Sequence, residues 1–223
     1  MHAILPAAGN ATRLRKLPKF LLPIDKEAKT LLERHIEILE PIVDIIWFPI
    51  KPDLIPLIID LGLSEKLICV PMKTKTMTET ILKTCELSGS KDFLMTMPDT
   101  YFTAETPSDN FFENLGIGTD LNLNLWSTRD NQRGKVGGVE LNSDLKVVNS
   151  VDKDPNSRLK FHWGSMYFNL NFVNILDEKM PHPGYAINKA LERQLKVSAR
   201  IMSGEYFDCG TFDEYKNLLN CLN

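Results

Sequence analysis

The feature that most constrains the fold is the start of the chain, where a short apolar stretch, His2 to Leu5, runs into a turn of small residues. This turn, Pro6-Ala7-Ala8-Gly9, lets the backbone approach a ligand closely, and consecutive amide hydrogens in such a turn form an anion-binding concavity. The pattern therefore predicts a first β-strand that ends in a phosphate-binding loop.

Arg13 and Lys19 follow this turn and add positive charge beside it. An arginine grips two phosphate oxygens through its planar guanidinium, whereas a lysine acts as a mobile point charge. Together they suit a nucleoside triphosphate. The residues that we predict to contact this nucleotide are Pro6, Ala7, Ala8, Gly9, Asn10 and Thr12.

Apolar strand-like runs alternate with helical patterns along the first half of the chain, which favours a mostly parallel sheet covered by helices. The predicted strands are His2 to Leu5, Asp44 to Phe48, Lys66 to Val70 and Phe93 to Met97. Further strands are expected at 121–125, 136–141, 146–151 and 161–168. We interpret the 223 residues, 43% of them hydrophobic, as one domain, with residues 1–120 binding nucleotide and residues 121–223 binding an acceptor.

The fourth predicted strand delivers a carboxylate, Asp99, just beyond its C-terminal end. Ligands of open α/β sheets gather outside those strand ends, so Asp99 should face the same cleft as the first loop. A carboxylate there can hold Mg²⁺ against triphosphate oxygens. The alternative is that Asp99 only stabilises a turn, where aspartate is common.

Together these segments resemble the sugar-1-phosphate nucleotidyltransferases, the family related to NDP-sugar pyrophosphorylases. The family begins with a strand and then Gly-x-Gly-Thr-Arg and Pro-Lys, which here read Gly9-Asn10-Ala11-Thr12-Arg13 and Pro18-Lys19. Its metal-binding Gly-Asp reads Pro98-Asp99, and its closing Asp-x-Gly-Thr reads Asp208-Cys209-Gly210-Thr211. Ala11 and Pro98 each replace a glycine of the family pattern. The resemblance implies a Rossmann-like, three-layer α/β/α (GT-A-like) fold.

Two later segments resemble the part of the family that binds the acceptor. The family's Gly-Val-Val-Glu strand reads Gly137-Gly138-Val139-Glu140, and its Glu-Lys-Pro reads Asp152-Lys153-Asp154-Pro155. Trp163 lies in a segment that resembles the strand lining the acceptor. The resemblance therefore implies that Gly137, Glu140, Asp152, Lys153 and Trp163 contact the acceptor. An ordinary solvated turn is the alternative for residues 152–155.

The resemblance also implies a reaction. An NMP group would pass from an NTP to a phosphorylated acceptor, either a sugar 1-phosphate or a similar phosphomonoester such as a phosphoamino compound, with release of pyrophosphate. Arg13 and Lys19 would be the catalytic residues and would neutralise the triphosphate, while Asp99 and Asp208 would hold Mg²⁺.

The segment that would bind the base, Thr76 to Leu82, carries hydroxyl side chains, and we place Thr76 and Thr78 together with Pro98 among the nucleotide-binding residues. Hydroxyl groups both donate and accept, so they do not select a base by themselves. A helix N-terminus rich in capping residues explains the threonines equally well. The identity of the base stays open.

Charge and cysteine content restrict the partners. A net charge of −3 and a pI near 5.9 do not favour nucleic acid binding. The four cysteines have neither zinc-site nor disulfide-framework spacing, and we find no signal peptide or apolar run of transmembrane length. These features predict a cytoplasmic enzyme that does not bind membranes, and they leave open whether it forms a homo-oligomer.

Two rival functions remain. One is a glycosyltransferase that consumes an NDP-sugar, which would carry Asp-x-Asp after the fourth strand, where this chain has Pro98-Asp99-Thr100. The other is a non-catalytic nucleotide-binding homologue, suggested by Ala11 and Pro98.

Overall fold

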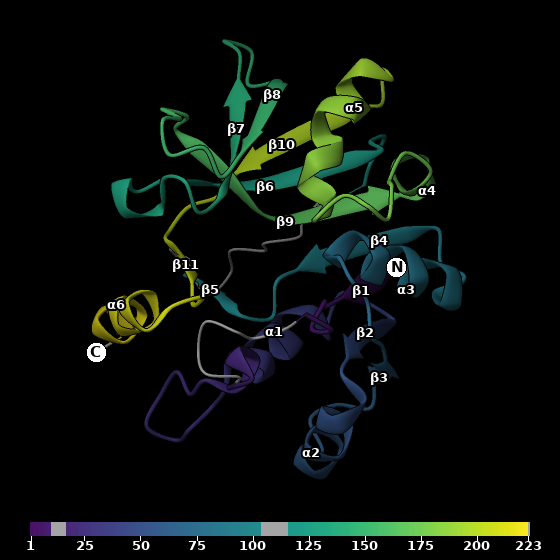
Figure 1. The fold of residues 1–223 in the computed structure, drawn as a ribbon, viewed down its shortest axis with the longest axis vertical. Coiled ribbons are helices and arrows are strands. Elements are labelled where there is room, and N and C mark those ends of the chain that lie inside the picture. Colours follow the sequence, from purple (N-terminus) through teal and green to yellow (C-terminus); the bar gives the residue numbers. More distant parts are fainter. Residues whose placement is uncertain (10–16, 104–115, 223) are drawn as a thin grey trace.

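The computed structural model describes residues 1–9, 17–103 and 116–222, and a nine-stranded mixed sheet forms its centre (Figure 1). Its parallel part, in the order β3-β2-β1-β4, comes from the first half of the chain. These strands are β1 (His2–Ile4), β2 (Ile45–Ile50), β3 (Leu67–Pro71) and β4 (Asp92–Thr96). The predicted α/β class with a mixed sheet is confirmed.

The second half of the chain extends the same sheet. Strand β9 (Phe161–Asn169) lies antiparallel between β4 and β6 (Leu121–Ser127), and β10 (Val197–Ile201) pairs parallel to β6 at the sheet edge. Strands β7 (Gly137–Leu141) and β8 (Val147–Asp152) form a hairpin that joins the sheet through β7 and β9. This hairpin lies at the opposite end of the molecule from α2 (Ile55–Leu61) (Figure 1).

Helices cover both faces of the sheet. Alternate residues of β1 point to opposite faces, so each face contributes apolar side chains to a core of its own. Ala3 packs in one core with α1 (Leu31–Leu39) and Ile58 of α2, whereas Ile4 packs in another core. The helices of that second face are α3 (Met77–Ser88), α4 (Leu170–Val173) and α5 (Ile187–Glu192). The result is three layers, helices on either side of a sheet.

Local signals start and stop the helices as the sequence indicates. Thr30 and Glu33 form a reciprocal capping box at the start of α1. Gly62 ends α2 in the left-handed region, with φ of 58°, and thereby satisfies the last turn without steric cost.

A second, two-stranded sheet lies beside the main one. Strand β5 (Thr100–Phe102) pairs antiparallel with β11 (Tyr206–Asp208), which leads into α6 (Phe212–Leu222). Thr211 accepts a hydrogen bond from the Glu214 amide at 3.3 Å and so caps the start of this helix. The pairing joins a segment near residue 100 to one near residue 208.

Some elements differ from the expectations. The charged segment 189–196 is helical only in its first half: α5 ends at Glu192 and the chain turns through Gln194, at φ of 58°, into β10. Strand β10 and helix α2 were not predicted.

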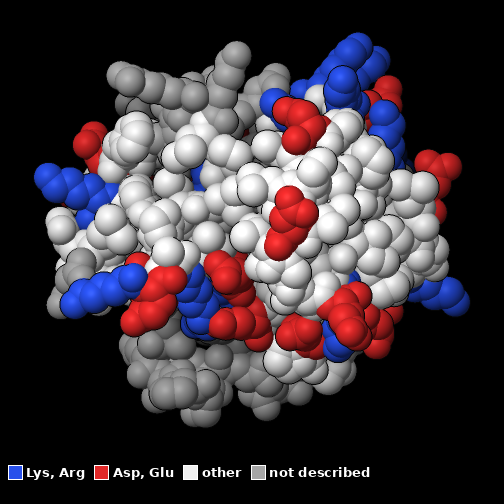
Figure 2. All heavy atoms as spheres, turned by 90° about the horizontal axis from the view of Figure 1, so that it is seen from below, with Lys and Arg blue, Asp and Glu red and all other residues white. Residues whose placement is uncertain are grey.

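None of the helices in the described part of the chain has the length and hydropathy that crossing a bilayer requires. On the face shown in Figure 2, acidic and basic side chains lie interspersed.

Candidate active site

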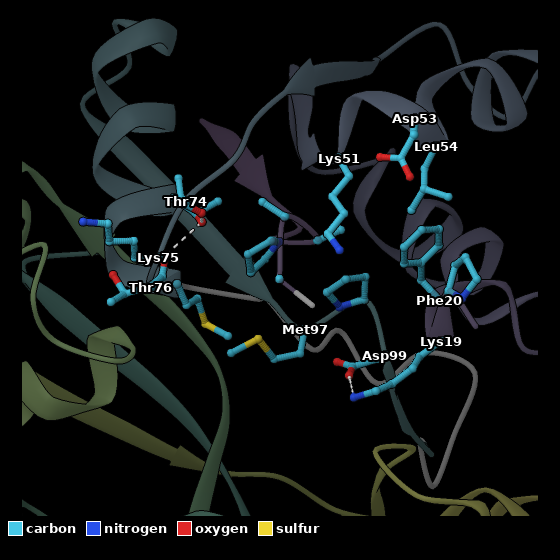
Figure 3. Close-up of a pocket in the computed structure, with 18 residues that line it drawn as sticks. Lys19, Phe20, Lys51, Asp53, Leu54, Thr74, Lys75, Thr76, Met97 and Asp99 are labelled. Carbon is cyan, nitrogen blue, oxygen red and sulfur yellow. Dashed lines mark hydrogen bonds and ion pairs between the residues drawn. The ribbon is translucent and has the colours of Figure 1, made fainter. Parts of the chain in front are cut away.

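A cavity of about 730 Å³ lies where the parallel strands of the first half end (Figure 3). Its walls come from the segments that directly follow β1, β2, β3 and β4, the edge at which ligands of open α/β sheets bind. The lining residues are Pro6 to Gly9, Pro18 to Phe20, Lys51, Asp53, Leu54, Thr74 to Met77, Thr80 and Met97 to Asp99.

The loop after β1 is fixed to its neighbouring strand. The Ala7 amide donates to the Pro49 carbonyl at 2.9 Å, and Ala7 forms a bridge with Ile50. Pro6, Ala7, Ala8 and Gly9 line the cavity as predicted, and a Cβ at Gly9 would meet no heavy atom within 4 Å. The backbone at Gly9 is thus open to a ligand. The predicted residues Asn10, Ala11, Thr12 and Arg13 lie outside the described residues.

Two of the predicted residues meet directly in this cavity. Lys19 begins the short 3₁₀ turn η1 (Lys19–Leu21), and its Nζ lies 2.8 Å from Oδ2 of Asp99. The two side chains are 17% and 29% exposed, so the ion pair is partly shielded from solvent. Pro98, the residue before Asp99, also lines the cavity. The arrangement places one positive and one negative group at the same wall.

A buried histidine supports the turn that carries Asp99. His35 of α1 lies behind this turn, with Nε2 2.8 Å from the Thr100 carbonyl. Burial lowers the pKa of His35 to about 4, so the ring is neutral at pH 7 and its Nε2–H donates to the carbonyl. His35 therefore helps to set the backbone position of the residue next to Asp99.

The second predicted metal ligand, Asp208, lies on the strand that neighbours Asp99. Asp208 is in register with Thr100, and the Cys209 amide donates to the Asp99 carbonyl at 3.1 Å. The charges of both aspartates act on the buried thiol of Cys209, whose pKa is raised first by burial and then by Asp99 and Asp208. Asp99 lines the cavity described above, whereas Asp208, on the neighbouring strand, is not among the lining residues.

The chemistry of this donor set fits Mg²⁺, which takes oxygen ligands and typically uses only one or two carboxylates. Among the residues that the structure describes, no group of three or more His, Cys, Asp or Glu side chains forms a denser metal site.

The opposite wall of the cavity carries Thr76, one of the two threonines predicted to bind the nucleotide. Thr76 caps α3 by accepting from the Glu79 amide at 3.0 Å, and its own hydroxyl donates to the Glu178 carbonyl at 2.6 Å. Thr78 is fully buried and is not among the residues that line the cavity. Thr80, one turn along the helix from Thr76, lines it instead, next to Thr74.

Three predicted acceptor residues gather at the base of the β7–β8 hairpin. Gly137 pairs with Asp152 across the hairpin, and a Cβ added to Gly137 would lie 2.3 Å from Nε1 of Trp163. Only glycine leaves room for this indole. Asp152 Oδ1 lies 3.0 Å from Nε2 of His182, whose ring centroid is 5.7 Å from that of Trp163.

The other two predicted acceptor residues are placed differently. Lys153 follows Asp152 directly and adopts a left-handed backbone, with φ of 48°. Glu140 is exposed farther along β7, where it faces Asn149 at 3.3 Å. The structure thus groups Gly137, Asp152 and Trp163 and leaves Glu140 apart from them.

Hydrogen bonds join the acceptor side to the cavity. The Met77 amide donates to the Pro181 carbonyl at 3.0 Å, one residue before His182. Trp163 also packs in the same hydrophobic core as Met77 and Met97, which line the cavity. Trp163 and His182 are thus connected to the cavity wall through Met77 and Pro181, although neither of them lines the cavity.

No protein-family model matches the chain, and no curated protein matches it. Solved structures do. A UDP-glucose pyrophosphorylase complexed with UDP-glucose superimposes with a TM-score of 0.81 at 18% identity, covering 99% of this chain and 97% of that one. A UTP-bound UDP-glucose pyrophosphorylase from Acinetobacter baumannii gives 0.79 at 16% identity, with 99% and 92% covered. A structure described as a glucose-1-phosphate thymidylyltransferase from Bacillus anthracis gives 0.80 at 16%, with 100% and 95% covered.

The chain has the fold of these nucleotidyltransferases. Within this nucleotidyltransferase fold, the cavity also contains residues that the sequence interpretation missed. They are Phe20, Lys51, Asp53, Leu54, Thr74, Lys75, Met77, Thr80 and Met97. The sequence position of Lys51 could have indicated it, because Lys51 directly follows β2, the strand that pairs with β1, and ligands bind beyond such strand ends.

Proposed function

We propose that the protein is a nucleotidyltransferase that transfers an NMP group from an NTP to a phosphorylated small molecule and releases pyrophosphate. The observation that carries the proposal is the Lys19–Asp99 pair in a cavity whose floor is the loop Pro6 to Gly9. A cation, a carboxylate and a close-approach loop at one sheet edge are the groups that a metal-bound triphosphate needs. Solved structures of the same fold contain UTP or UDP-glucose, which supports the proposal.

Magnesium is the metal that the proposal includes. Asp99 and Asp208 would hold it, and when bound it would neutralise charge on the phosphates. The carboxylate of Asp99 reaches the cavity itself, and Asp208 lies on the strand paired with β5.

The chain's own groups bind and orient the nucleotide. The open backbone at Gly9 admits phosphate oxygens, and the Lys19 ammonium offers them a positive charge. Arg13, predicted from the sequence, would add a bidentate cation. An acceptor phosphate attacks the α-phosphorus while pyrophosphate leaves, so the protein contributes positioning and charge neutralisation.

The acceptor side of the proposal rests on the second half of the chain. Gly137, Asp152 and Trp163 meet at the base of the β7–β8 hairpin, and Lys153 follows Asp152. We assign the acceptor phosphate to Lys153 and the remainder of the acceptor to the residues around Trp163, with Glu140 at the rim. All four cysteines are free thiols, which supports the expected cytoplasmic location.

The test is pyrophosphate release, measured with Mg²⁺ for ATP, UTP, CTP and GTP against a panel of acceptors. The panel combines sugar 1-phosphates with phosphoamino compounds such as phosphocholine. Acceptor-dependent pyrophosphate release supports the proposal. Release of free sugar or nucleoside diphosphate from an NDP-sugar, without pyrophosphate, would instead identify a glycosyltransferase.

A further inference from the structure

The Lys19–Asp99 ion pair joins the group proposed to bind the triphosphate to the group proposed to bind the metal. Figure 3 shows the Lys19 side chain extending to the Asp99 carboxylate, where Nζ and Oδ2 are 2.8 Å apart. At that separation the two opposite charges largely cancel for any ligand farther away. A polyphosphate that approaches Lys19 therefore meets a carboxylate as well, and a cation that approaches Asp99 meets an ammonium.

The backbone on both sides of the pair is fixed by hydrogen bonds. The Lys19 carbonyl accepts from the Leu22 amide at 3.0 Å in the turn η1, and the next residue, Phe20, is buried in the core. The Asp99 carbonyl accepts from the Cys209 amide at 3.1 Å. The pair can consequently open by side-chain rotation alone, and the long, flexible lysine is the partner better able to move.

Opening the pair is favourable only when both groups gain new partners. If Lys19 turned to phosphate oxygens alone, the Asp99 carboxylate would lose its cation and lie close to added negative charge. If Asp99 held a cation alone, the Lys19 ammonium would lie close to added positive charge. Both side chains are less than one-third exposed, so water compensates only partly for either loss. A metal–polyphosphate complex supplies both partners at once.

Resting on the proposed function, we propose that Lys19–Asp99 is an autoinhibitory ion pair. It weakens binding of a polyphosphate alone or of a divalent cation alone, and it is exchanged for two new contacts when the two ligands bind together. In this exchange Lys19 leaves Asp99 for phosphate oxygens beside the loop Pro6 to Gly9, which lines the same cavity. Removal of either side chain should therefore strengthen binding of the ligand that belongs to the other.

The first experiment is equilibrium binding of inorganic tripolyphosphate to the full chain after a chelator has removed divalent metal. Asp99→Asn should bind tripolyphosphate at least about fivefold tighter than wild type, because a partly shielded ion pair exceeds the value of an exposed one. Asp53→Asn is the matched control, because Asp53 lines the same cavity and its loss removes an equal charge. Asp53 is exposed, so its removal should change the affinity by less than about twofold.

The double variant separates autoinhibition from simple charge repulsion. In a Lys19→Met background, Asp99→Asn should improve tripolyphosphate binding by less than about twofold, because the ammonium that it would release is gone. A gain of equal size in both backgrounds would mean that Asp99 only repels the ligand, and the inference would be wrong. The absence of any gain in Asp99→Asn also overturns it.

The converse variant examines the metal side of the pair. Lys19→Met should bind Mg²⁺, added without nucleotide, at least about fivefold tighter than wild type in a calorimetric titration. Lys75→Met is the matched control, because Lys75 lines the same cavity with its ammonium directed away from Asp99 (Figure 3). An unchanged Mg²⁺ affinity in Lys19→Met contradicts autoinhibition.

Binding of ATP, UTP, CTP and GTP with Mg²⁺ to wild type checks the proposed function separately. If wild type binds none of them, the proposed function fails and the autoinhibitory pair with it. If wild type binds a nucleotide but the variants bind tripolyphosphate and Mg²⁺ as wild type does, only the autoinhibitory pair is wrong. Thermal melting of each variant confirms that it is folded.

Discussion

Lys19 and Asp99 are 80 residues apart in the sequence, yet the Lys19 ammonium lies 2.8 Å from the Asp99 carboxylate. Each side chain balances the charge of the other at the cavity wall. Both are less than one-third exposed, so solvent compensates only partly for the loss of either partner. The pair places the group proposed to bind the triphosphate against the group proposed to bind the metal.

This relationship predicts a non-additive pair of variants. Lys19→Met and Asp99→Asn should each lower kcat for pyrophosphate release by roughly 10² to 10³, the usual effect of removing one preorganised charge. The double variant should be little worse than either single variant, because the two groups act as a unit. Steady-state pyrophosphate assays of all four proteins measure this. Effects that multiply would show that the two residues act independently.

The second prediction concerns magnesium. Asp99→Asn and Asp208→Asn keep side-chain size but remove charge, so each should raise the Mg²⁺ concentration needed for half-maximal activity. Titrating Mg²⁺ into the variants after removal of metal by a chelator measures the shift. Asp60→Asn, on the exposed surface of α2, is the control. A variant of Asp208 with the wild-type Mg²⁺ dependence would remove that residue from the metal site.

The third prediction separates the acceptor from the nucleotide. Lys153 has a left-handed backbone, which asparagine tolerates better than most residues, so Lys153→Asn removes the charge with little strain. The variant should raise the KM of the acceptor and leave NTP binding nearly intact. Lys146→Asn, at an exposed position just before β8, is the matched control. A comparable loss of NTP affinity, measured by titration, contradicts the assignment of Lys153 to the acceptor.

Much of the fold was predictable because its signals are local. The apolar strands depend on residues a few positions apart, and their positions agree with the structure to within a few residues. Asp99 was placed at the cavity by a general rule about strand ends. Strand β10 was missed because its residues Val197 to Ile201 follow a charged segment, and only pairing with β6 makes them a strand.

Other parts of the site depend on contacts that no local pattern reveals. The sequence gives no sign that His35 of α1 reaches the Thr100 carbonyl, 65 residues away. Thr78 and Thr80 have the same side chain, and only the rotation of α3 buries one and brings the other to the cavity. The grouping of Trp163 with Gly137 depends likewise on the pairing of β7 with β9.

The last prediction is that stability falls as the pH drops from about 7 to 5, through two buried histidines. Burial lowers the pKa of both His35 and His162 to about 4, from an ordinary value of 6.5. In each ring one nitrogen has no hydrogen-bond partner within the described part of the chain, so a second proton would be buried without an acceptor. The unfolded chain binds these protons below pH 6.5 and the folded chain binds them only near pH 4.

The free energy of unfolding should consequently decrease, between those two values, by up to roughly 1.4 kcal/mol per histidine for each pH unit. Urea denaturation at intervals from pH 7 to 5 measures this slope, and His35→Gln should reduce it by about one histidine's share. His2→Gln should reduce the slope less than His35→Gln, because partial burial lowers the pKa of His2 to a smaller extent than full burial lowers that of His35. An unchanged slope in His35→Gln would mean that His35 is protonated in the folded protein. Its Nε2–H would then still reach Thr100, but the ring would carry a buried charge.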